Sequence, residues 1–256
     1  MKTTQKHLCT IVAAALLTLS ACTTARTEFD ITSRLIPVDS HWDQTPEPEM
    51  EALVAQYKTS VDSIMHIVIG TASQYMEAAR PGSLLTNLTA DIIKSEAAST
   101  FGEPADLAVT NIGGIRNPLM QGEITLGTVY SIFPFDNTLC LIKLKGSDLR
   151  ALFDIIASRG GEAVSHEVRM TLADGKATNL TIDGAPIDDN RIYSVATIDY
   201  VANGGDHMTP CLNATERKNS ATSLRDAVIN YIENETRAHR AISALDEVRI
   251  APANPQ

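Results

Sequence analysis

The sequence predicts an α+β fold in which helices pack on the faces of a mixed β-sheet. Segments with the period of a helix are interleaved with short apolar runs that are typical of strands. The runs 168–172 and 177–182 are separated by Asp174-Gly175, a dipeptide that favours a hairpin turn. Because interleaved elements and a hairpin occur together, we expect both parallel and antiparallel strand pairs.

The predicted elements follow one another from residue 49 to residue 250. Apolar positions about 3.6 residues apart predict an amphipathic helix over 49–64, and the run 64–69 predicts a strand that ends at Gly70. A second helix is expected over 84–99, with Gly102 beyond its C-terminus. The remaining helices are expected over 125–132, over 147–157 with Ser147 as N-cap, and over 220–234 with Ser220 as N-cap. The remaining strands are expected over 107–110, 138–144, 192–198 and 248–250.

The N-terminus has the layout of a secretory signal. A basic stretch with Lys2 and Lys6 precedes an apolar run from Leu8 to Leu19. This run is shorter than the roughly 18 to 20 residues that a bilayer-spanning helix needs. The sequence Leu-Ser-Ala-Cys ending at Cys22 has the pattern of a lipobox, in which the signal is cut before a cysteine that carries diacylglycerol. We therefore expect a lipoprotein with Cys22 as the lipidation site; a secreted protein without an anchor is the alternative.

The chain is expected to have three parts. Residues 1–21 form the lipoprotein signal peptide, 22–48 a tether, and 49–256 the folded domain. The tether is expected because this segment mixes Thr, Ser, Asp and Pro without a sustained period. This organisation predicts an exported bacterial lipoprotein in the periplasm or the outer membrane, which meets the membrane only through its lipid anchor.

The charge excludes one class of partner. The net charge is −10 at pH 7, so the surface should be acidic. Long nucleic acids are bound through a basic footprint, and we expect none of them as a partner. A small anion held by a few local arginines is compatible with this composition.

Two cysteines remain for the folded part. Cys9 leaves with the signal and Cys22 is the expected lipid site, so Cys140 and Cys211 are left. They could form one disulfide in an oxidising compartment, but two lone cysteines give no spacing signature. Because Cys140 sits in an apolar strand-like run, we favour two buried free thiols.

Three loop segments combine glycine with polar and aromatic residues beside predicted strands. They are 111–116 (Asn-Ile-Gly-Gly-Ile-Arg), 133–137 (Phe-Pro-Phe-Asp-Asn) and 200–206 (Tyr-Val-Ala-Asn-Gly-Gly-Asp). Ligand loops of sheet proteins commonly lie where strands end. Each segment alone could be only a turn or part of the core.

Together the three segments resemble the C-terminal domain of the 5'-nucleotidase family, which includes UDP-sugar hydrolases. The family pattern has Asn before Gly-Gly-Ile-Arg, then Pro-Phe with a polar residue two positions later, then an aromatic residue followed by Ala-Asn-Gly-Gly-Asp. All three occur here in this order. The resemblance extends from about Tyr57 to Ile250, and it implies the 5'-nucleotidase C-terminal fold.

The resemblance implies a nucleotide site. Phe135 and Tyr200 would stack on the two faces of a nucleobase, and Asp206 would accept hydrogen bonds from the ribose hydroxyls. Asn111 and Asn137 would meet polar edges of the nucleoside.

The glycines Gly113, Gly114 and Gly205 would let the backbone approach the ligand closely. Arg116 would reach the phosphate or the ribose, because a guanidinium can donate to two oxygens at once.

Two further residues match the family less closely. Arg80, ahead of Asn87-Leu88, is the candidate for a second phosphate-contacting arginine, although Gly82 stands where the family has an acidic residue. Simple surface charge is the alternative for Arg80. His207 stands where the family often has glycine; it could contact a phosphate when protonated, or it could simply face solvent.

No catalytic or metal-binding residue is predicted in this chain. In the full-length family a separate N-terminal domain holds two divalent metals, which activate water for attack on phosphorus. The six histidines are scattered here, without an Asp-x-His or a Gly-Asn-His-Glu motif. The expected function is therefore the nucleotide-recognition half of a split 5'-nucleotidase, inactive alone, with the metals on a separate metallophosphoesterase. A stand-alone nucleotide- or nucleoside-binding lipoprotein and a degenerate structural domain are the alternatives.

Overall fold

A five-stranded mixed sheet forms the centre of the protein. The computed structural model describes residues 31–44 and 47–253. In this sheet the strand order is β10-β4-β9-β2-β5. Tyr193 to Ile198 are all buried, so both faces of the central strand β9 are covered. The strands are β2 (Leu107–Thr110), β4 (Thr138–Lys145), β5 (Ala163–Val164), β9 (Ile192–Ile198) and β10 (Glu216–Ser223).

The pairing within this sheet is mixed, as predicted. β2 runs parallel to β9, with Ala108 opposite Ala196. β4 runs antiparallel to β9, with Leu139 opposite Ile198, and β10 runs antiparallel to β4. The mostly apolar runs at 107–110 and 192–198 form strands with the predicted bounds, because strands buried on both faces show no regular polar alternation.

Two smaller sheets complete the fold. The predicted hairpin is present: β6 (Val168–Ala173) and β7 (Lys176–Ile182) are joined by Asp174 and Gly175, whose φ angles of 49° and 71° suit a tight hairpin turn. β8 (Ala185–Pro186) and β11 (Ile250–Pro252) complete this four-stranded sheet. β1 (Val68–Ala72) pairs antiparallel with β3 (Gly122–Thr125).

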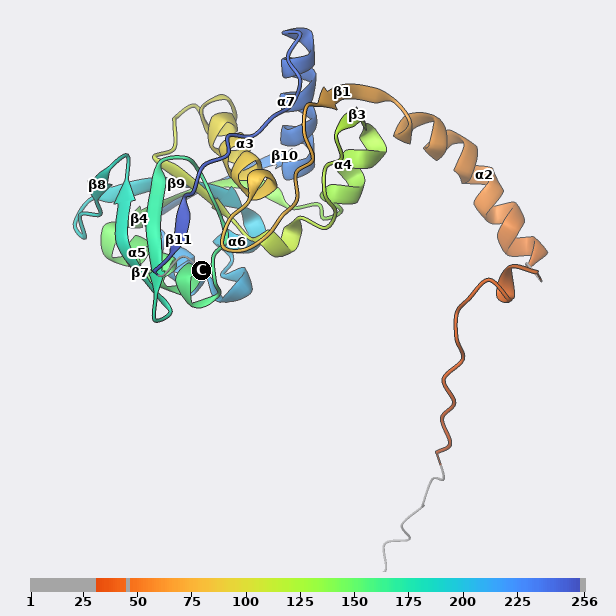
Figure 1. The fold of residues 1–256 in the computed structure, drawn as a ribbon, viewed down its shortest axis with the longest axis horizontal. Coiled ribbons are helices and arrows are strands. Elements are labelled where there is room, and N and C mark those ends of the chain that lie inside the picture. Colours follow the sequence, from red (N-terminus) through yellow and green to blue (C-terminus); the bar gives the residue numbers. More distant parts are fainter. Residues whose placement is uncertain (1–30, 45–46, 254–256) are drawn as a thin grey trace, which may run out of the picture. The chain divides into compact units, whose positions relative to one another are not determined.

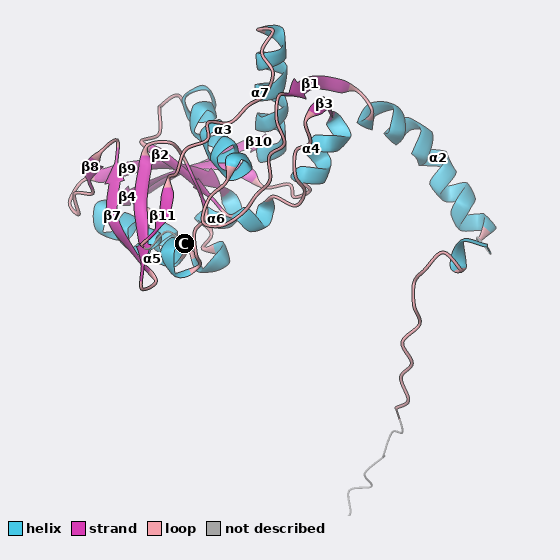
Figure 2. Cartoon of the chain, in the orientation of Figure 1, coloured by secondary structure: helices cyan, strands magenta, loops and turns pink. Residues whose placement is uncertain are grey.

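Helices enclose the strands (Figures 1 and 2). Helix α3 (Leu84–Phe101) has the predicted C-cap Gly102, whose φ is 74°, and at its N-terminus the Ser83 amide donates to Thr86 Oγ1 at 2.8 Å. Both α3 and α5 (Gly146–Ser158) contact the central strands β4 and β9. The other helices in the described part are α2 (Pro48–Met65), α4 (Leu126–Ile132), α6 (Asp199–Ala202) and α7 (Leu224–Arg237), with 3₁₀ turns at Trp42–Gln44, Ile112–Gly114, Gly205–His207 and Thr209–Asn213.

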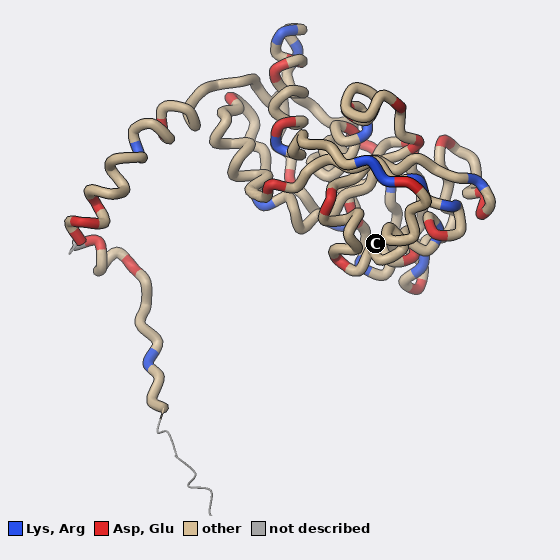
Figure 3. Tube along the Cα trace, turned by 180° about the vertical axis from the view of Figure 1, so that it is seen from behind, with Lys and Arg blue, Asp and Glu red and all other residues tan. Residues whose placement is uncertain are grey.

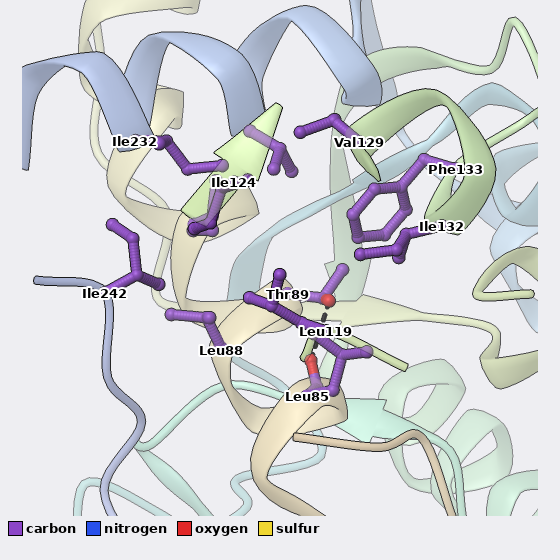
Figure 4. A pocket seen from close by; sticks show the side chains of 12 residues that line it. Leu85, Leu88, Thr89, Leu119, Ile124, Val129, Ile132, Phe133, Ile232 and Ile242 are labelled. Atoms are coloured by element: carbon purple, nitrogen blue, oxygen red, sulfur yellow. Dashed lines mark hydrogen bonds between the residues drawn. The ribbon is translucent and has the colours of Figure 1, made fainter. Parts of the chain in front are cut away.

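The core contains one small gap between α3, α4, α7 and β3 (Figure 4). Its volume is about 20 Å³, and almost all of its lining is aliphatic or aromatic. The Thr89 hydroxyl already donates to the Leu85 carbonyl at 2.7 Å, the bond drawn in Figure 4. An ordered water needs two to four polar partners. We therefore interpret this gap as imperfect packing and not as a ligand site.

A buried arginine fixes the C-terminal segment. Arg249 has a side chain only 1% exposed. It donates to both carboxylate oxygens of Asp91 in α3, at 2.7 and 2.6 Å, and to the Val164 carbonyl in β5 at 2.7 Å. Two parallel charge-assisted hydrogen bonds are strong and directional. The Arg249 carbonyl also accepts from the Met170 amide of β6 at 3.0 Å, and the last strand follows at 250–252, where 248–250 was predicted.

The predicted start of the last helix was wrong. Ser220 was expected to cap a helix over 220–234, but it lies within strand β10, which pairs with β4. The helix begins at Leu224, and its N-cap is Ser223, whose Oγ accepts from the Asp226 amide at 3.0 Å. Strand pairing with β4 therefore overrides the helical pattern of this polar segment.

Two further boundaries differ from the prediction. Ser147 was expected to cap α5, but the helix begins one residue earlier and its N-cap is Lys145. The strand expected over 64–69 begins only at Val68, because helix α2 continues to Met65. His66 therefore lies exposed in the turn between them and not in the strand, with Nδ1 2.6 Å from the Asp62 carbonyl.

The N-terminal part forms a separate unit from the main body. Among the described residues, those up to Ala52 belong to one unit and those from Leu53 onward to the other. The predicted helix before β1 is present as α2, but none of its side chains is buried. Within 31–44 and 47–253, no helix combines the length and the apolar character that crossing a bilayer requires. The predicted signal peptide and the lipidation site Cys22 lie outside the described residues.

The two cysteines of the folded part are free and buried, which confirms the favoured interpretation. Burial raises the pKa of the Cys211 thiol to about 12 and also raises the pKa of Cys140. Only a thiolate reacts readily with alkylating reagents.

In a protein with Cys9→Ala and Cys22→Ala, we expect neither remaining thiol to react with iodoacetamide at pH 8 in the native state. Both should react after unfolding in guanidinium, because burial no longer suppresses the thiolate. Mass spectrometry of the alkylated protein measures this difference. Fast native labelling of Cys211, or a mass that shows a Cys140–Cys211 disulfide, would contradict the prediction.

Candidate functional site

Three loops meet at one end of the strands of the five-stranded sheet. Since β2 runs parallel to β9, the chain leaves these two strands, after Thr110 and after Ile198, at the same end of the sheet. The Tyr200 loop, residues 199–206, begins there with the one-turn helix α6. Since β4 runs antiparallel to β9, with Leu139 opposite Ile198, the loop that enters β4 also lies there. These loops contain the three motifs of the predicted site.

A cleft lies between the loops. Its volume is about 520 Å³, within the range of roughly 300 to 1,000 Å³ typical of small-molecule sites. Its lining consists of Asn111, Gly113, Gly114, Phe135, Asp136, Asn137, Tyr200 and Asp206. All of these except Asp136 are predicted site residues, so the structure brings most of the predicted set together.

Two aromatic side chains offer exposed surface to the cleft. Phe135 is 50% exposed and Tyr200 is 41% exposed, whereas large aromatic residues are usually well buried. The Tyr200 ring lies against Gly205: a Cβ atom at Gly205 would be 2.5 Å from the ring's Cε1. Gly205 therefore does not line the cleft; it leaves the space that the Tyr200 ring occupies.

Asp199 joins two of the loops. Its Oδ1 accepts from the Asn137 amide at 2.9 Å, from the Thr138 backbone at 3.2 Å and from the Tyr200 backbone at 2.8 Å. One carboxylate oxygen therefore holds the loop that carries Phe135 next to the loop that carries Tyr200. The predicted ligand contact of Asn137 is limited by this bond, because its amide group already donates to Asp199.

Asp206 joins the first loop to the Tyr200 loop. Its Oδ2 accepts from Asn111 Nδ2 at 2.8 Å, and the Tyr200 hydroxyl lies 3.4 Å from its Oδ1. Asn111 is only 6% exposed, and its Oδ1 has no hydrogen-bond partner among the described residues. A buried acceptor without a donor costs free energy, so this oxygen is a cost that the contact between Asn111 and Asp206 has to offset.

The end of helix α5 brings two more charged residues to the site. Arg159 is the C-cap of α5 and is followed by Gly160 and Gly161, with φ angles of 82° and 110°. A Cβ atom at Gly161 would lie 2.2 Å from the Pro81 carbonyl oxygen, so only glycine fits there. This tight turn directs the next residue, Glu162, into the interior, where its side chain is fully buried.

Glu162 binds three donors. Its Oε1 accepts from Arg159 Nε at 2.8 Å and from Arg80 at 2.5 Å, and its Oε2 accepts from the Ile112 amide at 2.6 Å. The hydrogen bond to Glu162 raises the pKa of Arg159 above its ordinary value. Arg159 Nη2 also lies 3.5 Å from Asp206 Oδ1. The buried carboxylate thus connects the first loop to two arginines.

The predicted arginines lie outside the cleft lining. Arg116 is exposed and donates to the Gly113 carbonyl at 3.2 Å, at the end of the first loop. Arg80 pairs with Glu162 and also donates to the Gly161 carbonyl at 2.9 Å. His207 is exposed, in line with the solvent-facing interpretation.

Asp136 is a lining residue that the prediction missed. Its side chain is 91% exposed and forms an ion pair with Arg225 of α7, which is only 8% exposed. The Arg225 guanidinium also lies 4.2 Å from the centre of the Tyr130 ring. Asp136 follows Phe135 directly, so this contact holds the tip of the second loop against α7. Four residues of the site were missed by the sequence analysis: Asp136, Asp199, Arg159 and Glu162. Each lies beside a glycine or a motif residue, but contacts with residues distant in sequence bring it to the site.

The fold and the cleft define a small-molecule-binding domain with aromatic walls and carboxylate acceptors. The family model for the 5'-nucleotidase C-terminal domain matches residues 68–214. The chain therefore belongs to the 5'-nucleotidase C-terminal domain family, and a nucleotide fits as its ligand.

Two curated relatives and one solved structure illustrate the similarity. Protein UshA of Yersinia enterocolitica is 30% identical over 197 residues, which cover 74% of this chain and 35% of that protein. NAD 5'-nucleotidase of Haemophilus influenzae is 28% identical, over 67% of this chain and 32% of that protein. The crystal structure of a 5'-nucleotidase precursor from Thermus thermophilus superposes with a TM-score of 0.70 at 27% identity, over 84% of this chain and 45% of that one. The chain thus spans about a third of the length of these two curated relatives.

Among the residues that the structure describes, no group of three or more His, Cys, Asp or Glu side chains is placed to hold a metal ion.

We expect Asp199→Ala to destabilise the fold by about 2 kcal/mol, because it leaves three donors without their shared acceptor. Asp199→Asn is the matched control: its amide oxygen can still accept the same bonds, so its cost should be clearly smaller. Urea unfolding followed by circular dichroism measures both free energies. Equal costs for the two variants would show that the shared acceptor does not hold the loops together.

Proposed function

We propose that this protein is the nucleotide-recognition half of a split 5'-nucleotidase. It would bind a nucleoside 5'-phosphate, and a separate metallophosphoesterase would hydrolyse the nucleotide to nucleoside and phosphate. The observation that carries the proposal is the placement of Phe135 and Tyr200 in one cleft with Asp206. In this proposal the divalent metals lie on the partner, and this chain holds no cofactor.

The chemistry of the cleft suits a nucleoside. A base that stacks on Phe135 and Tyr200 would gain on the order of 1 to 3 kcal/mol per contact. The Asp206 carboxylate lines the cleft and is an acceptor for ribose hydroxyls. Gly113 and Gly114 line the cleft without side chains, so the ligand can approach the backbone there.

The charges near the cleft are compatible with a phosphate. Asp136 would repel a phosphate, but Arg225 neutralises it. Arg116 is exposed at the end of the first loop and supplies a guanidinium that can donate to two phosphate oxygens. Acidic and basic segments are interspersed along the chain (Figure 3), and the net charge is −10, which supports a small ligand and not a long nucleic acid.

Exposed apolar side chains beside the loops support a protein partner. Leu212 is 61% exposed, and its Cδ1 lies 3.3 Å from the position that a Cβ of Gly204 would take, next to the Tyr200 loop. Tyr130, which packs on Arg225 beside the second loop, is 40% exposed. Aromatic residues are enriched in protein interfaces, and the buried centre of an interface is more apolar than the rest of the surface. A surface at the cleft is where the phosphoesterase would have to meet the bound nucleotide.

The location we propose is outside the cytoplasm, with a lipid anchor at Cys22. A cell wall protein of Listeria monocytogenes, Lmo0130, is 26% identical over 234 residues. The periplasm and the outer membrane remain the two proposed places.

A stand-alone binding protein for nucleotides or nucleosides is the second candidate. The cleft serves both functions equally well, since binding alone needs no partner. The apolar side chains Leu212 and Tyr130 beside the loops favour the split enzyme over it.

Binding is tested by calorimetric titration with adenosine, adenosine monophosphate and a UDP-sugar. We expect Phe135→Ala and Asp206→Ala each to weaken binding about tenfold or more, through the loss of stacking and of a charged acceptor. Tyr75→Ala is the matched control, because Tyr75 is also an exposed aromatic residue, at 47%, but lies outside the cleft lining. No binding by the unmodified protein would sink the proposed function and leave the family assignment standing.

The partner is tested by phosphate release from adenosine monophosphate. The purified protein with Mn²⁺ is expected to release none. The exported protein fraction of the source bacterium, prepared from a strain without this gene, is expected to gain activity when the protein is added back. Phe135→Ala should restore much less activity. Hydrolysis by the purified protein alone, or equal restoration by Phe135→Ala, would contradict a split enzyme.

A further inference from the structure

One side of helix α2 is an exposed apolar surface. Over residues 53–65 the large apolar side chains recur every three or four positions, which places them on one side of the helix. Their exposed fractions lie between 48% and 60%. A contiguous apolar surface of this kind marks a place where another molecule binds. We call it the α2 face; it consists of Leu53, Val54, Tyr57, Val61 and Ile64.

The charges of the helix favour a protein over a lipid surface as the molecule that binds the α2 face. Helices that lie on a membrane surface are rich in Lys and Arg on their polar side. Over residues 53–65, Lys58 is the only Lys or Arg. Its Nζ donates to Asp62 Oδ2 at 2.6 Å, so its charge is paired within the helix. The α2 face therefore lacks the positive charge that would attract it to anionic lipid headgroups.

The size of the α2 face favours an occupant that also contacts neighbouring surface. The helix over residues 53–65 is about 20 Å long and about 10 Å wide. A standard protein interface buries roughly 800 Å² on each partner. A second copy of this chain that docked helix to helix would gain too little from this contact alone.

The surface next to the α2 face leads to the cleft. The Leu126 amide at the start of α4 donates to the Ile67 carbonyl at 3.0 Å, so α4 begins beside the turn that follows α2. Helix α4 is about 10 Å long and runs into the loop that carries Phe135. Tyr130 of α4 is 40% exposed. A partner on the α2 face that extends along α4 therefore reaches the cleft.

The position of α2 along the chain points to the same kind of partner. The family model describes a C-terminal domain, and its match begins at residue 68, directly after the turn that follows α2. In a protein with this domain at its C-terminus, the rest of the protein comes before the domain. Two such relatives are about three times as long as the part that this chain matches. Helix α2 thus lies where the remaining part of those proteins would be joined.

We propose that the α2 face is the docking surface for the separate metallophosphoesterase, which presents an apolar groove to α2 and extends along α4 to the cleft. This inference rests on the proposed function and names the surface that the partner contacts. A helix that binds in a groove typically does so through apolar side chains about one turn apart. The α2 face has this spacing at Leu53, Tyr57, Val61 and Ile64.

The test compares two double variants that add the same charge to opposite sides of α2. Val54→Glu with Val61→Glu changes the α2 face, and Ala52→Glu with Thr59→Glu changes the opposite side. All four positions are exposed and glutamate favours helices, so both variants should fold. The assay is phosphate release from adenosine monophosphate by the exported fraction of a strain without this gene, with Mn²⁺ and increasing amounts of purified full-length protein.

The variant of the α2 face is expected to need at least about tenfold more protein for half-maximal activity, because the added charges would lose their hydration in the groove. The variant of the opposite side should stay within about twofold of the unmodified protein. Calorimetric titration with adenosine monophosphate should give both variants the unmodified affinity within about twofold, since none of the four positions lines the cleft.

A crosslink identifies the molecule that binds the α2 face. A photoreactive benzophenone amino acid in place of Tyr57 should crosslink, in the same exported fraction, to a protein that mass spectrometry identifies as a metallophosphoesterase. Crosslinks only to lipid, to a second copy of this chain or to its own residues 31–44 would overturn the proposal. This measurement carries the test if the double variant of the α2 face does not fold.

The outcomes separate this inference from the proposed function. Equal activity with both double variants would overturn the docking role and leave the split enzyme standing. A loss of nucleotide affinity that accounts for the lost activity would also overturn it, because the cleft and not the docking would then be impaired. If the unmodified protein binds adenosine monophosphate but restores no activity, the split enzyme fails and this inference fails with it.

Discussion

The pairing of β9 with β4 on one side and β2 on the other is the constraint on which the site depends. Both faces of β9 are buried, so its register is fixed: a shift by one residue would exchange the side chains of the two faces. β2 is parallel to β9 and β4 is antiparallel to it. The loops that follow β2 and β9 therefore lie at the same end of the sheet as the loop that precedes β4. A wholly parallel arrangement would have sent the Phe135 loop to the opposite end of the sheet. The mixed sheet is therefore a requirement of the cleft.

Carboxylates then determine the positions of the loops. Asp199 joins the second loop to the third, Asp206 joins the third to the first, and Glu162 joins the first to the end of α5. Each accepts from a backbone amide, a side-chain amide or a guanidinium, and hydrogen bonds with an ionised partner are about twice as strong as neutral ones. Buried apolar side chains such as Ile112, Phe133 and Val201 anchor each loop in the core, and the polar contacts join the loops to one another.

The sequence predicted the strands at 107–110 and 192–198 and the helix at 84–99 closely, because in these segments burial and local pattern agree. It failed at β10, an edge strand with exposed polar residues whose conformation is decided by pairing with β4. The cleft was foreseen as three motifs, since each motif is contiguous in sequence. The contacts that hold it together could not be foreseen, because Arg159 and Asp206 are far apart along the chain and nothing in their spacing indicates contact. A second glycine pair, at 160–161, followed by an acid was the available signal, and its meaning depends on the position of Pro81.

The distribution of charge indicates which part of a nucleotide this protein would hold. The acceptors that face the cleft suit the hydroxyls and amino groups of a nucleoside, whereas the arginines are committed elsewhere: Arg80 to Glu162, and Arg225 to Asp136. Arg116 is the remaining candidate of the predicted set, and it lies exposed with a single contact to the Gly113 carbonyl. A phosphate with two negative charges normally needs several donors at once. Base and sugar would therefore be recognised inside the cleft, while the phosphate would point outward, toward the position where a metal-bearing partner could reach it.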